Sequence, residues 1–217
     1  MRLTREKIGP VCRNIPLKLP ARVHPDPRVS GVFSRTVVSA DQLPRTIVRI
    51  AHEILEKDHD AGGLAIVGIH TRGAHLAHRL TRLLEEFSGR EIPVGELDIS
   101  LYRDDVAARG SLTVRPKLTH PELRGTNLPF SIDEKTIVLV DDVLFTGRTI
   151  RAAIDALFDY GRPARIQLAV LVDRGHRELP IRPDYVGKNL PTSQDERINV
   201  HLKEVDGVDE IILEAVE

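Results

Sequence analysis

The chain has 217 residues, of which 41% are hydrophobic, and a formal net charge of −1. It is therefore long enough for one domain, with or without an appendage, and its total charge does not point to nucleic acid. Its single cysteine, Cys12, excludes an internal disulfide, no stretch approaches the roughly 20 apolar residues that span a membrane, and the N-terminus lacks the apolar segment of a secretory signal, so we expect a cytoplasmic protein.

Residues 1–36 are interpreted as a basic, proline-rich N-terminal extension of a domain that occupies residues 37–217. Five prolines fall within residues 1–31, and residues 1–30 contain seven Lys or Arg against two acids, a net charge of +5. No helical or strand periodicity accompanies them, which is typical of a flexible arm. The arm could contact RNA or have no role of its own, and we favour the second interpretation.

A helix is predicted over about residues 40–57. Ser39 followed by Gln42 matches a capping box, and apolar residues recur behind it at helical spacing, at Leu43, Ile47, Ile50 and Ile54. The opposite face carries Arg45, Arg49, His52 and Glu56. Because charged helical faces are usually solvated, this pattern alone does not indicate RNA binding.

The first buried strand is predicted at residues 64–69, and an apolar-periodic helix follows at 74–87. Between them lies a glycine-containing turn, His70-Thr71-Arg72-Gly73. Another strand is predicted at residues 97–101. After it, residues 102–131 show no periodicity, which is uncommon in a compact domain unless the segment is a lid or a binding loop.

Residues 136–149 are the most informative stretch of the chain. A continuous apolar run, Ile137 to Val140, predicts a strand that is buried on both faces, as in a parallel sheet covered by helices. Two aspartates follow, and then a turn of Thr, Gly, Arg and Thr that opens a helix. Backbone N–H groups and hydroxyls at a helix N-terminus suit a phosphate, whereas two carboxylates suit the hydroxyls of a ribose. A phosphorylated ribose satisfies the whole stretch, and the absence of Gly-x-x-x-x-Gly-Lys excludes a Walker A loop.

Beyond this motif we expect a helix at 149–160, a buried strand at 166–172 and a charged segment, 173–197, that closes over one end of the ligand. Two short strands, 198–205 and 210–216, form a terminal pair with Asp206-Gly207 in the turn between them. The fold class is therefore α/β, with a central, mainly parallel sheet flanked by helices. In such a sheet the turns at 70–73 and 141–149 share one edge, where a ligand with two phosphate groups could bridge them.

The stretch Val138-Leu-Val-Asp-Asp-Val-Leu-Phe-Thr-Gly-Arg-Thr149 resembles the phosphoribosyl-pyrophosphate (PRPP) signature of type I phosphoribosyltransferases. Further stretches narrow the resemblance to the PyrR family of bifunctional pyrimidine-operon regulators and uracil phosphoribosyltransferases: Arg49-Ile-Ala-His-Glu53, Val67-Gly-Ile-His-Thr-Arg-Gly73, Leu101-Tyr-Arg-Asp-Asp105 and Val172-Asp-Arg-Gly-His-Arg-Glu-Leu-Pro-Ile181. The resemblance covers about residues 37–217. It implies the type I phosphoribosyltransferase fold, with a flexible catalytic loop and a small hood over the base site.

The resemblance also implies roles for single residues. The residues implied to bind PRPP are Asp141, Asp142, Val143, Leu144, Phe145, Thr146, Gly147, Arg148 and Thr149. Pyrophosphate binding falls to Thr71, Arg72 and Gly73, and the catalytic loop begins at Tyr102 and Arg103. Arg174 and Ile198 resemble positions at the base end, and Arg49 and His52 match the RNA-binding helix, where Val48 replaces a common threonine.

The implied activities are conversion of uracil and PRPP to UMP and pyrophosphate, and attenuation of pyrimidine genes by binding of the operon's mRNA leader in the presence of UMP or UTP. The implied cofactor is Mg²⁺, held mainly through PRPP without a dedicated protein ligand, and the implied assembly is a homodimer or larger homo-oligomer. Two alternatives stay open: an RNA-binding regulator that uses the site as a nucleotide sensor, or a type I phosphoribosyltransferase for another base. Phe145 disfavours a purine, because purine-using relatives often place an acid at this position.

Overall fold

The computed structural model describes residues 33–58, 63–102, 125–193 and 195–215. The chain divides into two units, residues 1–31 and 32–217. The first unit lies outside the described residues, so the predicted flexibility and role of the extension stay predictions. Within the described part of the chain, no helix is long and apolar enough to cross a membrane.

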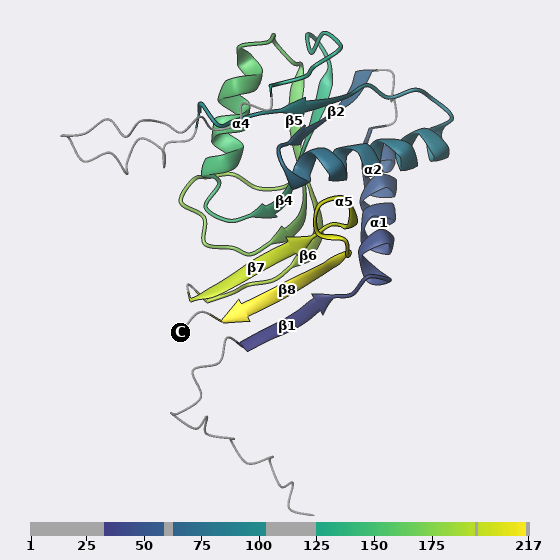
Figure 1. The fold of residues 1–217 in the computed structure, drawn as a ribbon. Coiled ribbons are helices and arrows are strands. Elements are labelled where there is room, and N and C mark those ends of the chain that lie inside the picture. The colour runs from purple at the N-terminus through teal and green to yellow at the C-terminus, as the bar shows by residue number, and fades with distance from the viewer. Residues whose placement is uncertain (1–32, 59–62, 103–124, 194, 216–217) are drawn as a thin grey trace, which may run out of the picture. The chain divides into compact units, whose positions relative to one another are not determined.

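The second unit is built around a five-stranded parallel sheet (Figure 1). Its strands, in spatial order, are β3 (Val94–Leu97), β2 (Leu64–Ile69), β4 (Thr136–Leu144), β5 (Arg165–Asp173) and β6 (Tyr185–Asn189). The central strands are the continuous apolar runs of the sequence, and β2 is buried along its whole length. The predicted α/β class with a mainly parallel sheet is confirmed.

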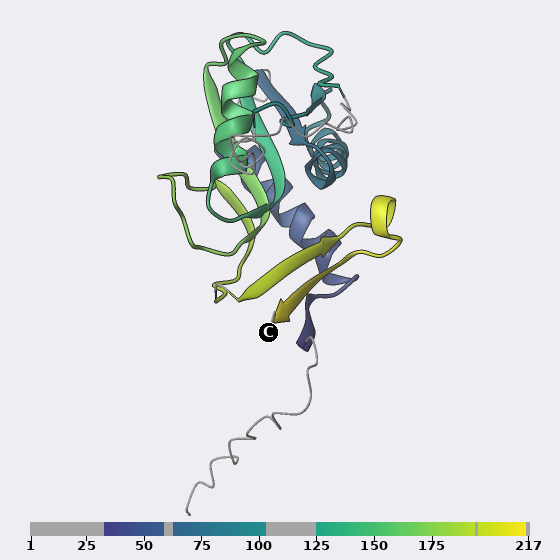
Figure 2. The same cartoon turned by 60° about the vertical axis from the view of Figure 1, so that its left-hand side comes forward.

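Helices cover both faces of this sheet (Figures 1 and 2). The helices α1 (Gln42–Lys57) and α2 (Arg72–Ser88) bury their apolar faces in one core cluster, together with residues of β2, β4 and β5. The helix α4 (Arg148–Phe158) buries its own in a second cluster on the opposite face. Each helix repeats its apolar residues at 3.6-residue spacing, so a single stripe meets the sheet.

A second, antiparallel sheet contains β1 (Phe33–Val38), β8 (Glu210–Ala215) and β7 (Glu196–His201) in that order. The short helix α5 (Lys203–Asp206) forms the connection between β7 and β8. The predicted terminal strand pair is present, but its first strand, predicted at 198–205, ends at His201, and α5 occupies the end of that range. Residues 33–36, which the sequence analysis assigned to the extension, belong to β1, so the boundary at residue 36 falls inside a strand.

Two sequence predictions about strands differ from the structure. The strand predicted at 97–101 ends at Leu97, because the Asp98 carboxylate accepts hydrogen bonds from the N–H (2.8 Å) and the hydroxyl (2.5 Å) of Ser100 and so forms a turn. The segment 173–197 contains β6, which the sequence analysis missed. This strand pairs with β5 on one side only, and its Gly, Lys and Asn residues leave no apolar run to detect.

Candidate active site

The acid pair lies in β4 near its carboxyl end, in the middle of the sheet. Asp141 is 7% exposed and lies opposite Val170 of β5 in the strand register. The Asp141 carboxylate accepts a hydrogen bond from the N–H of Asp142 (3.0 Å), and the Asp142 carboxylate accepts one from the N–H of Val143 (2.8 Å). Burial raises the pKa of Asp142, although the Val143 N–H and the positive charge of Arg72 oppose that rise. The two backbone hydrogen bonds therefore fix the orientation of both carboxylates.

The turn after β4 leads directly into the N-terminus of α4. Gly147 is the residue before the helix and has φ of +93°, a left-handed conformation that favours glycine. The hydroxyl of Thr146 accepts a hydrogen bond from the N–H of Arg148 at 3.4 Å. The first N–H groups of α4 have no partner inside the helix, so this turn can bind an anion.

The segment from Asp173 to Ile181 holds this turn in place. The carbonyl of Thr146 accepts hydrogen bonds from the N–H groups of Glu178 (3.1 Å) and Leu179 (3.2 Å). The Arg177 guanidinium donates to the carbonyls of Phe145 (2.7 Å), Gly175 (3.0 Å) and Ile181 (3.0 Å) and to the Asp173 carboxylate (2.6 Å). The sequence analysis missed Arg177, because its partners become visible only when the two segments lie side by side.

The turn between β2 and α2 meets the acid pair. The peptide bond between His70 and Thr71 is cis. A Cβ atom at Gly73 would collide with the carbonyl oxygen of Val140 and come within 3.3 Å of the Asp141 Cα. Only a glycine allows the two backbones to approach this closely, so the two turns predicted to share one edge of the sheet do lie together.

The predicted base end contains a cluster of stacked side chains. The Arg174 guanidinium lies 4.0 Å from the ring centroid of Phe145, and the His176 ring meets the same ring edge-on at 5.8 Å. Arg174 donates to the hydroxyl of Thr192 (3.1 Å) and to the carbonyl of Glu196 (2.8 Å), at the start of β7. Ile198 belongs to the same strand. Phe145 as a whole is 37% exposed beside this cluster, and an exposed aromatic ring suits contact with a planar ligand.

Tyr102 lies away from these groups. Its hydroxyl donates a hydrogen bond to the Asp159 carboxylate at the C-terminal end of α4, and this bond raises the pKa of Tyr102. Asp159 is separated from the Gly147 turn by the length of α4, which is roughly 16–18 Å at 1.5 Å per residue. Arg103 and most of the predicted lid lie outside the described residues.

Arg49 and His52 lie on the exposed face of α1 and are engaged in contacts. Arg49 forms an ion pair with Glu53 (2.5 Å) and donates to the carbonyls of Val186 (3.0 Å) and Gly187 (2.5 Å) in β6. His52 stacks on Phe87 of α2, with ring centroids 4.3 Å apart. A groove of about 380 Å³ adjoins Arg49 and is lined by Val38, Gln42, Arg45, Thr46, Arg49 and Lys188.

The described residues contain no group of three or more His, Cys, Asp or Glu side chains that could hold a metal ion. Asp141 and Asp142 nevertheless offer the hard oxygen ligands that Mg²⁺ prefers. Two carboxylates are too few for a site made by the protein alone, so the residues fit a cation that the ligand itself helps to hold.

Comparisons with known proteins agree with this geometry. The family model described as "Phosphoribosyl transferase domain" matches residues 39–204. The "Bifunctional protein PyrR" of Chloroflexus aurantiacus is 56% identical over 179 residues, which cover 82% of this chain and 94% of the relative. The protein of the same name from Thermus aquaticus is 56% identical over 181 residues, covering 83% and 96%.

Solved structures give the same fold at low identity. A hypoxanthine phosphoribosyltransferase of Trypanosoma cruzi aligns with a TM-score of 0.61 and 18% identity, covering 84% of this chain and 97% of that one. A hypoxanthine-guanine phosphoribosyltransferase of Bacillus anthracis aligns with a TM-score of 0.62 and 19% identity, covering 86% and 100%. The family match and the shared fold thus identify a phosphoribosyltransferase with the type I fold. Within that class, the chain belongs to the PyrR family.

Proposed function

We propose that the chain converts uracil and PRPP to UMP and pyrophosphate, and that it regulates pyrimidine genes by uridine-nucleotide-dependent binding of their mRNA leader. The partners are PRPP, uracil, UMP or UTP, the RNA and further copies of the chain. The observation that carries the enzymatic role is the contact between Gly73 and Val140, because it joins a diphosphate-binding turn to the acid pair.

In the proposed reaction each part of the site meets one part of the donor. The carboxylates of Asp141 and Asp142 accept hydrogen bonds from the two ribose hydroxyls. The turn from Thr146 to Thr149 binds the 5′-phosphate at the N-terminus of α4, and Thr71 to Gly73 bind the diphosphate at the N-terminus of α2. These groups hold the anomeric carbon between the leaving pyrophosphate and the base, which lowers the entropic cost of the transfer.

The negative charges of the acid pair complement the positive charge that develops on the ribose during the transfer. The bond from the anomeric carbon to pyrophosphate breaks while positive charge grows on the ribose, which the nearby carboxylates tolerate. Asp141 and Asp142 would help the donor to hold Mg²⁺, which would neutralise part of the diphosphate charge. Preorganised donors such as the turn N–H groups are worth about 3–4 kcal/mol each in comparable sites.

Uracil is the acceptor that the base end favours. Phe145 offers an apolar face in place of the acid that would assist a purine, and Arg174 fixes that ring by stacking on it. The segment from Val172 to Ile181, which resembles the PyrR family, packs directly against the phosphoribose turn. The same loop thereby contacts both the proposed base-binding residues and the proposed phosphate-binding turn.

The enzymatic role is tested by UMP formation from PRPP and millimolar uracil with Mg²⁺. The double variant Asp141→Asn with Asp142→Asn should abolish the reaction, because amides keep the shape but lose the charge that balances the transition state. Its thermal unfolding midpoint serves as the fold control. Failure of the wild-type chain to form UMP would refute the enzymatic role.

The regulatory role is favoured by the groove beside Arg49. Three cations, Arg45, Arg49 and Lys188, line it, and it lies along α1 and β6 rather than at the acid pair. We expect UMP to strengthen binding of the leader RNA, and Arg49→Ala to weaken it and to lower the slope of log affinity against log salt by about one. Arg151→Ala, on α4 across the sheet, is the matched control. Equal binding with and without UMP would contradict this role.

A further inference from the structure

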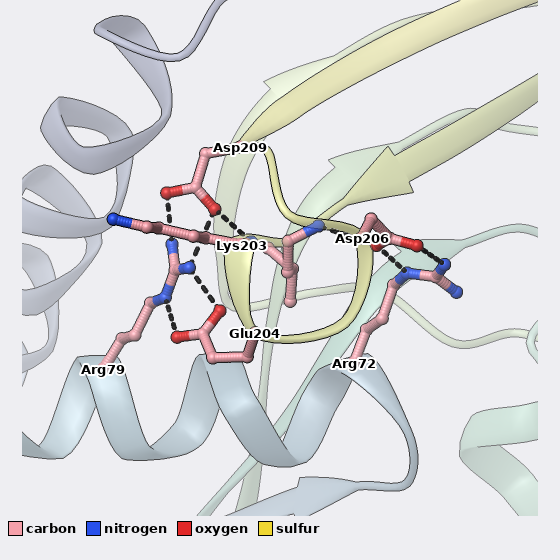
Figure 3. A network of polar contacts seen from close by, with 7 residues as sticks. Arg72, Arg79, Lys203, Glu204, Asp206 and Asp209 are labelled. Atoms are coloured by element: carbon pink, nitrogen blue, oxygen red, sulfur yellow. Dashed lines mark hydrogen bonds and ion pairs between the residues drawn. The ribbon is translucent and has the colours of Figure 1, made fainter.

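The side chain of Arg72, at the start of α2, meets a carboxylate that comes 134 residues later in the chain (Figure 3). Its Nε donates to Oδ2 of Asp206 at 3.3 Å, and its Nη2 donates to Oδ1 of the same residue at 2.9 Å. The two side chains are 34% and 21% exposed. This two-point pair links the proposed pyrophosphate turn to α5, between β7 and β8.

The geometry of the pair leaves part of the guanidinium for another anion. Arginine carries five N–H donors in a rigid planar fork, and a carboxylate can occupy only one edge of it. Asp206 takes the edge formed by Nε and Nη2. Among the described residues, nothing accepts a hydrogen bond from the edge formed by Nη1 and the second Nη2 hydrogen, so this edge can donate to a phosphate oxygen.

Other contacts fix Asp206 itself. Its Oδ2 accepts a hydrogen bond from the N–H of Leu202 at 2.9 Å, and the bond from Arg72 holds the pKa of Asp206 below its usual value. Arg79, two turns further along α2, donates to Glu204 at 2.8 Å and to Asp209 at 2.7 Å (Figure 3). The helix α5 is thus anchored to α2 at a second point. Movement of the Arg72 side chain therefore cannot easily displace Asp206.

We propose that Asp206 is a positioning residue of the pyrophosphate site, which holds Arg72 so that the remaining edge of its guanidinium binds the diphosphate of PRPP and of the product. The inference rests on the proposed transferase function. A long arginine side chain loses rotamer freedom when it binds an anion. A carboxylate that has already ordered this side chain removes that cost from the binding step.

The test is Asp206→Asn in the full chain. The amide oxygen can still accept the hydrogen bond from the N–H of Leu202, so the connection between β7 and β8 keeps this contact while Arg72 loses its charged partner. We expect the KM for PRPP and the inhibition constant of pyrophosphate to rise together by about two- to tenfold. The kcat and the KM for uracil should change by less than about twofold, since the lost ordering affects donor and product binding equally.

Glu204→Gln is the matched control, because it removes the same charge from α5 but at a residue that pairs with Arg79. It should leave the KM for PRPP unchanged. Equal or tighter pyrophosphate binding by Asp206→Asn would overturn the proposal and identify Asp206 as a competitor for Arg72. An equal rise in the KM for PRPP with Glu204→Gln would also overturn the proposal, because the rise would then result from loosening of the whole β7–α5–β8 segment.

Calorimetric titration of pyrophosphate with Mg²⁺ separates this proposal from the function on which it rests. A wild-type chain that neither forms UMP nor binds pyrophosphate would refute both. A wild-type chain that does both, alongside an Asp206→Asn variant with the same pyrophosphate affinity, would refute only the role of Asp206.

Discussion

Arg177→Gln should weaken both the fold and the binding of PRPP. The Arg177 side chain is 22% exposed, and its guanidinium joins the Asp173 carboxylate and four backbone carbonyls, including that of Phe145 in the turn after β4. Glutamine is too short to reach these acceptors and carries no charge. The change removes the charged partner of the Asp173 carboxylate, which among the described residues keeps only the Gly175 N–H as a donor, and it removes the Arg177 donor from several carbonyls.

The expected cost follows from these contacts. A hydrogen bond to a charged group contributes about 1.5–3 kcal/mol, and removing one partner of a buried ion pair costs about 3–5 kcal/mol. Partial exposure and non-additivity bring the total to about 3 kcal/mol. For a domain of this size, that lowers the unfolding midpoint by about 6–12 °C. The KM for PRPP should rise about tenfold or more, because misplacement of a binding turn by 1 Å can cost two orders of magnitude.

Thermal unfolding and steady-state kinetics of two variants measure this effect. Arg151→Gln is the control, because Arg151 pairs with Asp155 on the surface of α4, with both side chains 53% exposed, and such pairs contribute about 0–1 kcal/mol. An Arg177→Gln variant with the unfolding midpoint and the KM of the wild-type chain would refute the assignment of Arg177 as the residue that holds the turn.

Two further predictions concern the backbone contact and the buried tyrosine. Gly73→Ala should abolish UMP formation, because the added Cβ has no room beside Val140. Gly63→Ala is the control and should leave activity unchanged, because a Cβ there meets nothing within 4 Å. Similar kinetics for both variants would contradict the close contact between Gly73 and Val140. Burial, with the charges of Asp184 and Asp58, raises the pKa of Tyr185 to about 12. Since an unfolded tyrosine ionises near pH 10, unfolding above that pH releases a proton, and wild-type stability should fall by about 1.4 kcal/mol per pH unit up to pH 12. Denaturant titrations of Tyr185→Phe should lose this part of the slope, and an identical alkaline slope would disprove the shift.

The central layer of the fold could be predicted because its signals are local. The strands β2, β4 and β5 are continuous apolar runs, and α1, α2 and α4 repeat their apolar residues at helical spacing. The acid pair and the turn after it also form one contiguous stretch. Their placement on one edge with the turn at Gly73 follows from the parallel sheet alone.

The contacts that complete the site could not be predicted in the same way. Arg177 contacts Phe145 across 32 residues, and Arg72 contacts Asp206 across 134. Neither Arg177 nor Asp206 differs in type or spacing from an ordinary surface charge. The Asp206-Gly207 pair has the composition of a simple turn, and Gly207 does end α5 with φ of +77°. Only the folded arrangement of β7, β8 and α2 gives that aspartate a partner near the site.

The same long-range pairs determine how the site can attract a donor that carries several negative charges. Each arginine proposed to bind phosphate forms an ion pair with an acid, Arg72 with Asp206 and Arg148 with Glu178. With the acid pair, the six groups carry two positive and four negative charges, a net charge of −2. Among the described residues, the net side-chain charge alone would therefore not attract the proposed donor, and its binding would also depend on the N–H groups of the two helix N-termini and on a divalent cation. Calorimetric titration of PRPP should accordingly lose at least about tenfold in affinity when EDTA replaces Mg²⁺, and an unchanged affinity would show that the backbone donors suffice.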